Sequence, residues 1–294
     1  MKENIFKGLG IALVTPFDRE GNVDYHALLT LVDHQIKGGI DYLCILGTTA
    51  ETPCLTREEK TKIKECVVKH VAGRIPILMG CGGNCTAAVV EEIRSTDWTG
   101  IDGILSVCPM YNKPTQEGIY QHYRAIAAVS PRPIVLYNVP GRTGVNMLAE
   151  TTLRLANEFP NIVAIKEASG NMQQIGEILE KRPQGFDVIS GDDSLTLTIM
   201  KKGGAGVISV VGNARPEELS QMVHLMQQGR LAEATIINDN LFELYGLMFI
   251  EGNPAGVKSA LHTMGIIEEV LRLPLVPISD KTRQKLSEVL EKLS

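Results

Sequence analysis

Eight short apolar runs, each followed by a segment with helical periodicity, most constrain the fold of this chain. The runs lie at 10–15, 42–46, 75–79, 101–107, 134–137, 162–166, 187–190 and 205–210. Unbroken apolar runs of this length, bounded by turn residues, are typical of strands buried on both faces of a parallel sheet. Eight strands that alternate with helices predict an α/β protein with a closed (β/α)8 TIM barrel. The alternative is an open doubly wound sheet, but no glycine-rich dinucleotide fingerprint follows the first run.

The pattern changes after the eighth run. The segments 231–250, 254–263 and 280–293 all show helical periodicity, and no further strand is predicted among them. We therefore expect two parts, a barrel over residues 1–228 and a C-terminal helical extension over residues 229–294 that packs on the barrel.

The composition predicts a soluble globular protein of the cytoplasm. Hydrophobic residues make up 44% and charged residues 21% of the 294 residues, which is ordinary for a globular chain. The net charge of -5 and the lack of a Lys/Arg block argue against nucleic acid and anionic membranes as partners. The N-terminus has no apolar signal segment, and no apolar run approaches the ~20 residues of a membrane span. The six cysteines form no Cys-x-x-Cys pair, which favours reduced, buried thiols.

The residues that follow the predicted strands are the candidates for chemistry, because the carboxyl ends of barrel strands converge on one pocket. This set is poor in metal ligands. Asp192 and Asp193 are expected to cap the next helix rather than to bind a cation. We expect no metal, since all six histidines fall on predicted helices: His26, His34, His70, His122, His224 and His262.

Lys166 ends the apolar run 162–165 abruptly. A lysine held against apolar walls loses part of its preference for the charged form, so its amine can attack a carbonyl substrate and form a Schiff base. Tyr137 ends the preceding strand, where its hydroxyl could move the protons of such a reaction. The alternatives are a solvated lysine at a strand edge and an ordinary aromatic side chain at the barrel rim.

Two further segments carry groups suited to carboxylates. Arg142 lies in a loop stiffened by Pro140 and Gly141, from which its guanidinium could bind a carboxylate with two hydrogen bonds. Thr48 and Thr49 follow the second strand, where their hydroxyls and backbone N–H groups could hold a small carboxylate. The alternatives are a solvated loop arginine and an ordinary polar turn.

Six short motifs occur together at the predicted strand ends. They are G-T-T-A-E at 47–51, Y-N-K-P at 111–114, Y-N-V-P-G-R-T-G at 137–144, I-K-E-A-S at 165–169, S-G-D-D at 190–193 and G-V-I-S at 206–209. None is specific alone, but jointly they are very specific. With them, nearly the whole chain resembles the pyruvate-dependent Schiff-base aldolase family of (β/α)8 barrels, and within it the dihydrodipicolinate synthase group.

The resemblance implies the class I aldol condensation of pyruvate with L-aspartate 4-semialdehyde, which gives 4-hydroxy-tetrahydrodipicolinate in lysine and diaminopimelate biosynthesis. The enzyme would be a lyase without a cofactor, working through a covalent imine between pyruvate and Lys166. The alternative within the family is an N-acetylneuraminate lyase or a 2-keto-3-deoxy sugar acid aldolase. An inactive barrel that binds a keto acid or a partner is a third reading, disfavoured because Lys166 and Tyr137 are both present.

The resemblance also implies the roles of the other site residues. Tyr137 would be the proton donor and acceptor, with Thr48 and Tyr111 completing a hydroxyl relay. Thr49 would bind the pyruvate carboxylate and Arg142 the carboxylate of aspartate 4-semialdehyde. Gly191 and Ile208 would line the pocket through their backbone groups.

The family is typically a homotetramer, a dimer of dimers. Tyr111 would then reach into the site of the neighbouring subunit across the tight dimer, so that a dimer is the least active unit.

The chain departs from the family pattern in two places. Ala50 stands where G-T-T-G-E has its second glycine, which raises the question whether that turn needs a positive φ. At the lysine feedback site, members that are inhibited by lysine carry His, Glu and Tyr where this chain has Lys60, Ala88 and Met110. A like charge and two apolar groups thus replace groups that bind a cation, and we expect weak or absent inhibition by lysine.

Overall fold

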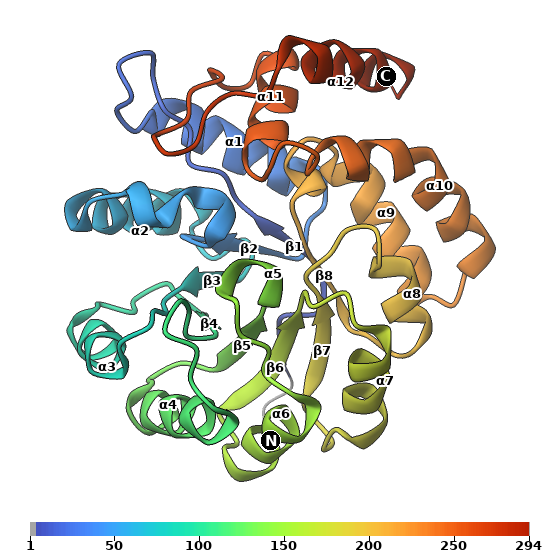
Figure 1. The fold of residues 1–294 in the computed structure, drawn as a ribbon. Coiled ribbons are helices and arrows are strands. Elements are labelled where there is room, and N and C mark those ends of the chain that lie inside the picture. Colours follow the sequence, from blue (N-terminus) through green and yellow to red (C-terminus); the bar gives the residue numbers. More distant parts are fainter. Residues whose placement is uncertain (1–3, 294) are drawn as a thin grey trace. The chain divides into compact units, whose positions relative to one another are not determined.

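The strands of the computed structural model, which describes residues 4–293, form one closed barrel (Figure 1). They follow one another around the barrel in sequence order. This confirms the TIM-barrel prediction. The strands are β1 Gly8–Ala12, β2 Tyr42–Ile45, β3 Ile77–Gly80, β4 Gly103–Val107, β5 Ile134–Asn138, β6 Ile162–Glu167, β7 Asp187–Ser190 and β8 Gly206–Ser209.

Helices separate the strands and also form the C-terminal part of the chain. They are α1 Tyr25–Lys37, α2 Arg57–Val71, α3 Thr86–Ser95, α4 Gln116–Val129, α5 Pro140–Thr143, α6 Ala149–Glu158, α7 Met172–Lys181, α8 Thr196–Lys201, α9 Pro216–Gln227, α10 Leu231–Leu247, α11 Ala255–Thr263 and α12 Asp280–Lys292. Three short 3-10 helices are η1 Thr48–Ala50, η2 Thr52–Cys54 and η3 Val211–Asn213. No helix within the described residues is long and apolar enough to cross a bilayer.

Local sequence signals explain several of these helix starts. The Asp24 side chain accepts a hydrogen bond from the Ala27 N–H and caps α1. Thr56 and Glu59 form a capping box at the start of α2, in which each side chain accepts from the other residue's backbone N–H. Pro216 is the first residue of α9, a position that its fixed φ suits.

The chain divides into two compact units. The first unit comprises the residues up to Lys7 and Pro76–Ile208, and it contains β3 to β8. The second comprises Gly8–Ile75 and the chain from Ser209 on, and it contains β1, β2 and the C-terminal helices. The expected boundary between residues 228 and 229 stays a prediction.

β1 lies two residues earlier than expected, and it ends at Ala12 rather than at Thr15. The cause is the side chain of Asn213. Its Oδ1 accepts from the Val14 N–H at 3.2 Å and its Nδ2 donates to the Ala12 carbonyl at 2.9 Å. The Asn213 amide therefore takes the place of a strand partner for these two groups, while the Leu13 N–H still donates to the Cys44 carbonyl of β2 at 3.0 Å.

The prediction that Asp192 or Asp193 caps the next helix is wrong. Helix α8 begins at Thr196, its N-cap is Leu195, and no side chain caps it. Asp192 Oδ1 instead accepts from the backbone N–H and the hydroxyl of Ser194, at 2.9 and 2.7 Å. The carboxylate therefore stabilises a local turn before the helix, a competing use that aspartate favours.

The packing around Gly103 yields a stability prediction. A Cβ added at Gly103 would lie 2.5 Å from Cζ of the buried Phe6 ring, so Gly103→Ala should lower the free energy of unfolding by about 1–3 kcal/mol through overpacking. Gly176, within α7, has no neighbour within 4 Å of such a Cβ. Gly176→Ala should therefore stabilise by about 0.5–1 kcal/mol, since alanine favours helix. Urea unfolding of both variants tests this, and equal effects would contradict it.

Candidate active site

Lys166 lies near the end of β6, a strand buried over almost its whole length. Its side chain is 5% exposed, and its Nζ lies 4.5 Å from the centre of the Tyr137 ring. The pairing of β5 with β6 sets Tyr137 directly opposite Lys166. The structure therefore brings together the two residues that the sequence predicted for imine formation and proton transfer, and the ring face can stabilise a cationic nitrogen.

Gly191 leaves room for the Lys166 side chain. Its N–H donates to the Glu167 carbonyl at 2.8 Å, which holds the residue after β7 against β6. A Cβ at this position would lie 2.6 Å from Cβ of Ala168 and 3.2 Å from Cε of Lys166. A larger residue would therefore displace Ala168 and press on the Lys166 side chain. Ile208 is buried in β8, the strand that pairs with β7.

Tyr111 and Arg142 lie on adjacent loops of the first unit. The Tyr111 N–H donates to the carbonyl of Thr143 at 3.2 Å, and Arg142 is exposed in the single turn of α5. The Tyr111 side chain is 87% exposed, and its φ of 73° is a left-handed conformation that costs a non-glycine residue free energy. The structure thus presents the Tyr111 ring at the surface of the subunit.

Glu167 is a site-adjacent residue that the sequence reasoning missed. It is fully buried and accepts hydrogen bonds from Asn138 Nδ2 at 3.2 Å, from the Ser169 N–H at 2.8 Å and from Gln174 Nε2 at 3.1 Å. Burial raises the pKa of Glu167, although these donors oppose the shift. A signal was available: two consecutive ionisable residues in a strand must point to opposite faces, so the residue after Lys166 needed partners of its own.

The Glu167 contacts continue into the loop that carries Arg142. Asn138 donates to Glu167 and to Asn146 Oδ1 at 2.8 Å, while its Oδ1 accepts from the Met147 N–H at 3.0 Å. Both ends of the segment between β5 and α6 are thereby tied to the strand pair that holds Lys166. One face of this strand pair therefore carries Lys166, and the other holds the segment that carries Arg142 through Glu167 and Asn138.

Thr48 and Thr49 belong to the second unit, in the 3-10 turn that follows β2. Thr48 is half-buried and Thr49 is buried. The hydroxyl oxygen of Thr49 accepts a hydrogen bond from Asn253 Nδ2 at 3.0 Å. Thr52 closes the turn by donating to the Gly47 carbonyl at 2.7 Å.

Ala50 fits the turn without strain. It belongs to the 3-10 helix η1, and the left-handed conformation falls on Glu51, with a φ of 53°. The family glycine is therefore not needed at position 50 for a positive φ. Ala50 is buried, and its carbonyl accepts from the Thr15 hydroxyl at 2.9 Å.

Residues 4–293 contain no group of three or more His, Cys, Asp or Glu side chains that could hold a metal ion. All six histidines lie in helices, as the sequence predicted.

Comparison with known proteins places the chain in a family. The model of the dihydrodipicolinate synthetase family matches residues 5–293. The chain belongs to this family. The recognition made from the six motifs is therefore confirmed.

Similar proteins and structures agree with this assignment. The chain is 57% identical to the 4-hydroxy-tetrahydrodipicolinate synthase of Phocaeicola vulgatus, over 100% of this chain and 99% of that protein. It is 44% identical to the synthase of Bacillus subtilis, over 98% and 99%. The crystal structure of the dihydrodipicolinate synthase from Aquifex aeolicus shares 43% identity and a TM-score of 0.95, with 98% of each chain covered. These similarities bear out the synthase activity and the biosynthetic pathway expected from the motifs.

The burial of Glu167 yields a pH-dependent prediction. Because the pKa is raised in the folded state, the folded protein binds this proton more tightly than the unfolded chain. The stability that Glu167 contributes is thus present at low pH and lost as pH rises through the raised pKa. The free energy of unfolding of the wild type minus that of Glu167→Gln should therefore shrink as pH rises above 4.5, the ordinary pKa of a glutamate. Urea unfolding at several pH values measures it, and a constant or growing difference would contradict the assignment.

Proposed function

We propose that the chain condenses pyruvate with L-aspartate 4-semialdehyde through a Schiff base on Lys166. The observation that carries the proposal is the buried Lys166 amine over the Tyr137 ring, in a chain more than half identical to a named synthase. The reaction needs no cofactor, because the iminium nitrogen itself withdraws the electrons that the new bond requires.

The imine forms on Lys166, reacts as an enamine and is then released. The neutral Lys166 amine attacks the ketone carbon of pyruvate, and loss of water leaves an iminium. Loss of a proton from the pyruvate methyl group gives an enamine, whose carbon attacks the aldehyde of the second substrate. The amino group of that substrate then displaces Lys166 from the former ketone carbon, which closes the ring and regenerates the enzyme.

Protons enter and leave through hydroxyls. Tyr137 is the donor and acceptor for Lys166, a role supported by its place opposite Lys166 in the strand register. Thr48 and Tyr111 complete the relay, with Tyr111 acting in the site of the neighbouring subunit. The exposure of the Tyr111 ring and its left-handed backbone support this role, because strain of this kind persists at functional positions.

The two substrate carboxylates have separate partners. Thr49 binds that of pyruvate, while Arg142 binds that of aspartate 4-semialdehyde with two charged hydrogen bonds. Gly191 and Ile208 line the pocket through their backbone. The absence of a side chain at Gly191 leaves the space that Lys166 needs.

The assembly that we propose is a cytoplasmic homotetramer, a dimer of dimers whose tight dimer shares Tyr111. A relative of 41% identity is described as the first monomeric variant of a dihydrodipicolinate synthase, which supports an assembled state as the usual one. We also propose that the C-terminal helical extension over 229–294 packs on the barrel over 1–228 in each subunit.

Borohydride reduction in the presence of pyruvate tests the imine. We expect one reduced pyruvyl adduct, on Lys166, in peptide mass mapping. Lys166→Arg should abolish the adduct, and Tyr137→Phe should slow its formation about 10²–10⁴-fold without moving it. Lys258 is an internal control, because it is also buried but is paired with Glu51. No adduct in the folded wild type, or an adduct on Lys258, would contradict the mechanism.

The second substrate is tested in the same preparation. Addition of L-aspartate 4-semialdehyde should give the cyclised product, whereas N-acetylneuraminate should release no pyruvate. The reverse result would assign the chain to the sugar acid lyases instead.

Inhibition by lysine should be weak or absent at millimolar lysine, at constant pH and ionic strength. Lys60, Ala88 and Met110 replace the groups that bind a cation in sensitive members. The structure of a relative from Cyanidioschyzon merolae, of 39% identity, is described with lysine bound. The triple variant Lys60→His, Ala88→Glu, Met110→Tyr should gain sensitivity, as judged by the lysine concentration for half inhibition. Near-complete inhibition of the wild type would refute the prediction.

A further inference from the structure

The turn that carries Thr48 and Thr49 depends on residues about two hundred positions later in the chain. Its own backbone bonds are short-range, such as Glu51 N–H to the Thr48 carbonyl at 3.1 Å and Cys54 N–H to the Glu51 carbonyl at 2.8 Å. Between them Glu51 adopts a left-handed conformation, which costs an L-residue about 1–2 kcal/mol. Bonds within the turn do not explain why this conformation is kept.

Lys258 of α11 supplies the first outside contact. It is fully buried, and its Nζ lies 2.5 Å from Oε1 of Glu51 and 2.9 Å from the Val270 carbonyl oxygen. The same nitrogen lies 4.0 Å from the centre of the Phe17 ring. Burial lowers the pKa of Lys258 to about 8, although the Glu51 charge opposes the shift. Because desolvation outweighs the attraction, the pair is better explained by the conformation it specifies than by stability.

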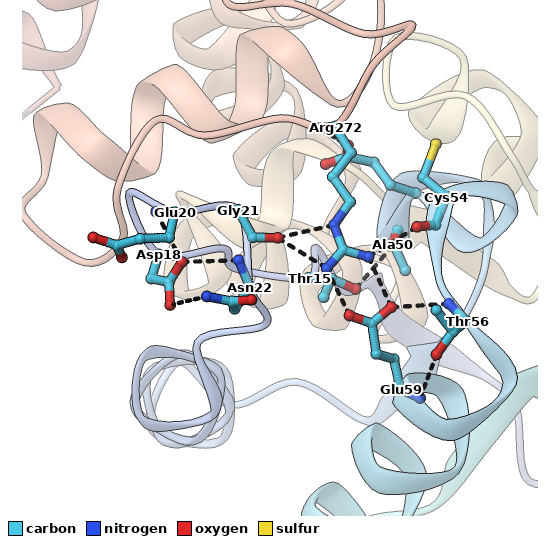
Figure 2. A network of polar contacts seen from close by, with 11 residues as sticks. Thr15, Asp18, Glu20, Gly21, Asn22, Ala50, Cys54, Thr56, Glu59 and Arg272 are labelled. Atoms are coloured by element: carbon cyan, nitrogen blue, oxygen red, sulfur yellow. Dashed lines mark hydrogen bonds and ion pairs between the residues drawn. The ribbon is translucent and has the colours of Figure 1, made fainter.

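Arg272 supplies the second outside contact, shown in Figure 2. Its guanidinium donates to both carboxylate oxygens of Glu59, to the Cys54 carbonyl at 2.8 Å and to the Gly21 carbonyl. Its backbone N–H donates to Oε2 of Glu51 at 3.0 Å. Arg272 therefore joins the end of the turn to the start of α2, and both carboxylate oxygens of Glu51 are held by the C-terminal part of the chain.

Asn253 supplies the third contact, which is made to Thr49, the residue proposed to bind the pyruvate carboxylate. Its Nδ2 donates to Oγ1 of Thr49 at 3.0 Å, and both side chains are buried. A hydroxyl that accepts this bond keeps its own proton for another acceptor. Asn253 thereby presents Thr49 as a hydrogen-bond donor, which is what a carboxylate requires.

We propose that Asn253 and Lys258 are positioning residues for pyruvate binding. Asn253 fixes the Thr49 hydroxyl as a donor, and Lys258 fixes the left-handed Glu51 that ends the turn. This inference rests on the proposed role of Thr49.

A double-mutant cycle tests the Asn253 contact. The readout is the pyruvate concentration that gives half-maximal borohydride trapping on Lys166. Asn253→Ala and Thr49→Val should each raise this concentration about tenfold, the size expected for one hydrogen bond to a charged group, with little change in the maximal trapping rate. In the Thr49→Val background, Asn253→Ala should add nothing, because Asn253 acts through Thr49. Independent, multiplying effects would overturn the proposal.

The Lys258 contact is tested with both charges removed together. Lys258→Met alone would leave Glu51 buried without its partner and could unfold the protein, so Lys258→Met is combined with Glu51→Gln. The double variant should fold and require several-fold more pyruvate for half-maximal trapping. Wild-type pyruvate dependence in the folded double variant would overturn this part.

Arg283→Gln is the matched control. In the same C-terminal region, Arg283 pairs with Glu269 and Asp280 and donates to the Ile278 carbonyl. These partners within residues 4–293 all lie outside the turn that carries Thr49. The pyruvate dependence of Arg283→Gln should match that of the wild type, and a rise equal to that of Asn253→Ala would indicate general loosening and overturn the proposal. Absence of any adduct in the wild type would overturn the proposed function as well. A normal wild-type adduct, together with variants whose pyruvate concentration for half-maximal trapping equals that of the wild type, would overturn the positioning role alone.

Discussion

The first unit depends on how two consecutive ionisable residues are held at the end of a buried strand. Lys166 and Glu167 project to opposite faces of β6, and neither has bulk water to stabilise its charge. The Lys166 amine lies over the Tyr137 ring. Glu167 accepts hydrogen bonds from Asn138, Ser169 and Gln174. The hydrogen bonds that satisfy Glu167 thus hold the loop that bears Arg142. The proposed imine lysine and the proposed carboxylate ligand therefore share one framework.

Much of this architecture could be predicted from the sequence because its signals are local. Apolar runs, the Thr56 and Glu59 capping box and Pro216 each act within a few residues, and the motifs located the candidate site. The failures have the opposite character. β1 ends early because of Asn213, about two hundred residues away. Asp192 accepts a hydrogen bond from Ser194 instead of capping the helix. Asn253, Lys258 and Arg272 carry no local signal at all, since their partners lie far away in sequence.

The two units use buried charge in the same way, with different partners. In the first unit a carboxylate is surrounded by neutral amide donors, and burial raises its pKa. In the second, Glu51 has a buried cation, and burial lowers the pKa of that cation, Lys258. In both cases desolvation opposes the charged form. Each arrangement also fixes a backbone segment that bears proposed substrate ligands.

This view accounts for Ala50. A turn without outside contacts would favour glycine at its left-handed position, because glycine adopts that conformation without a steric penalty. Here the left-handed residue is Glu51, whose two carboxylate oxygens are held by Lys258 and by the Arg272 backbone. Those contacts offset the cost of the conformation, and the residue before it can then remain in the ordinary 3-10 region, where alanine is tolerated. The departure from the family motif is therefore compatible with an intact turn, as long as the C-terminal contacts are made.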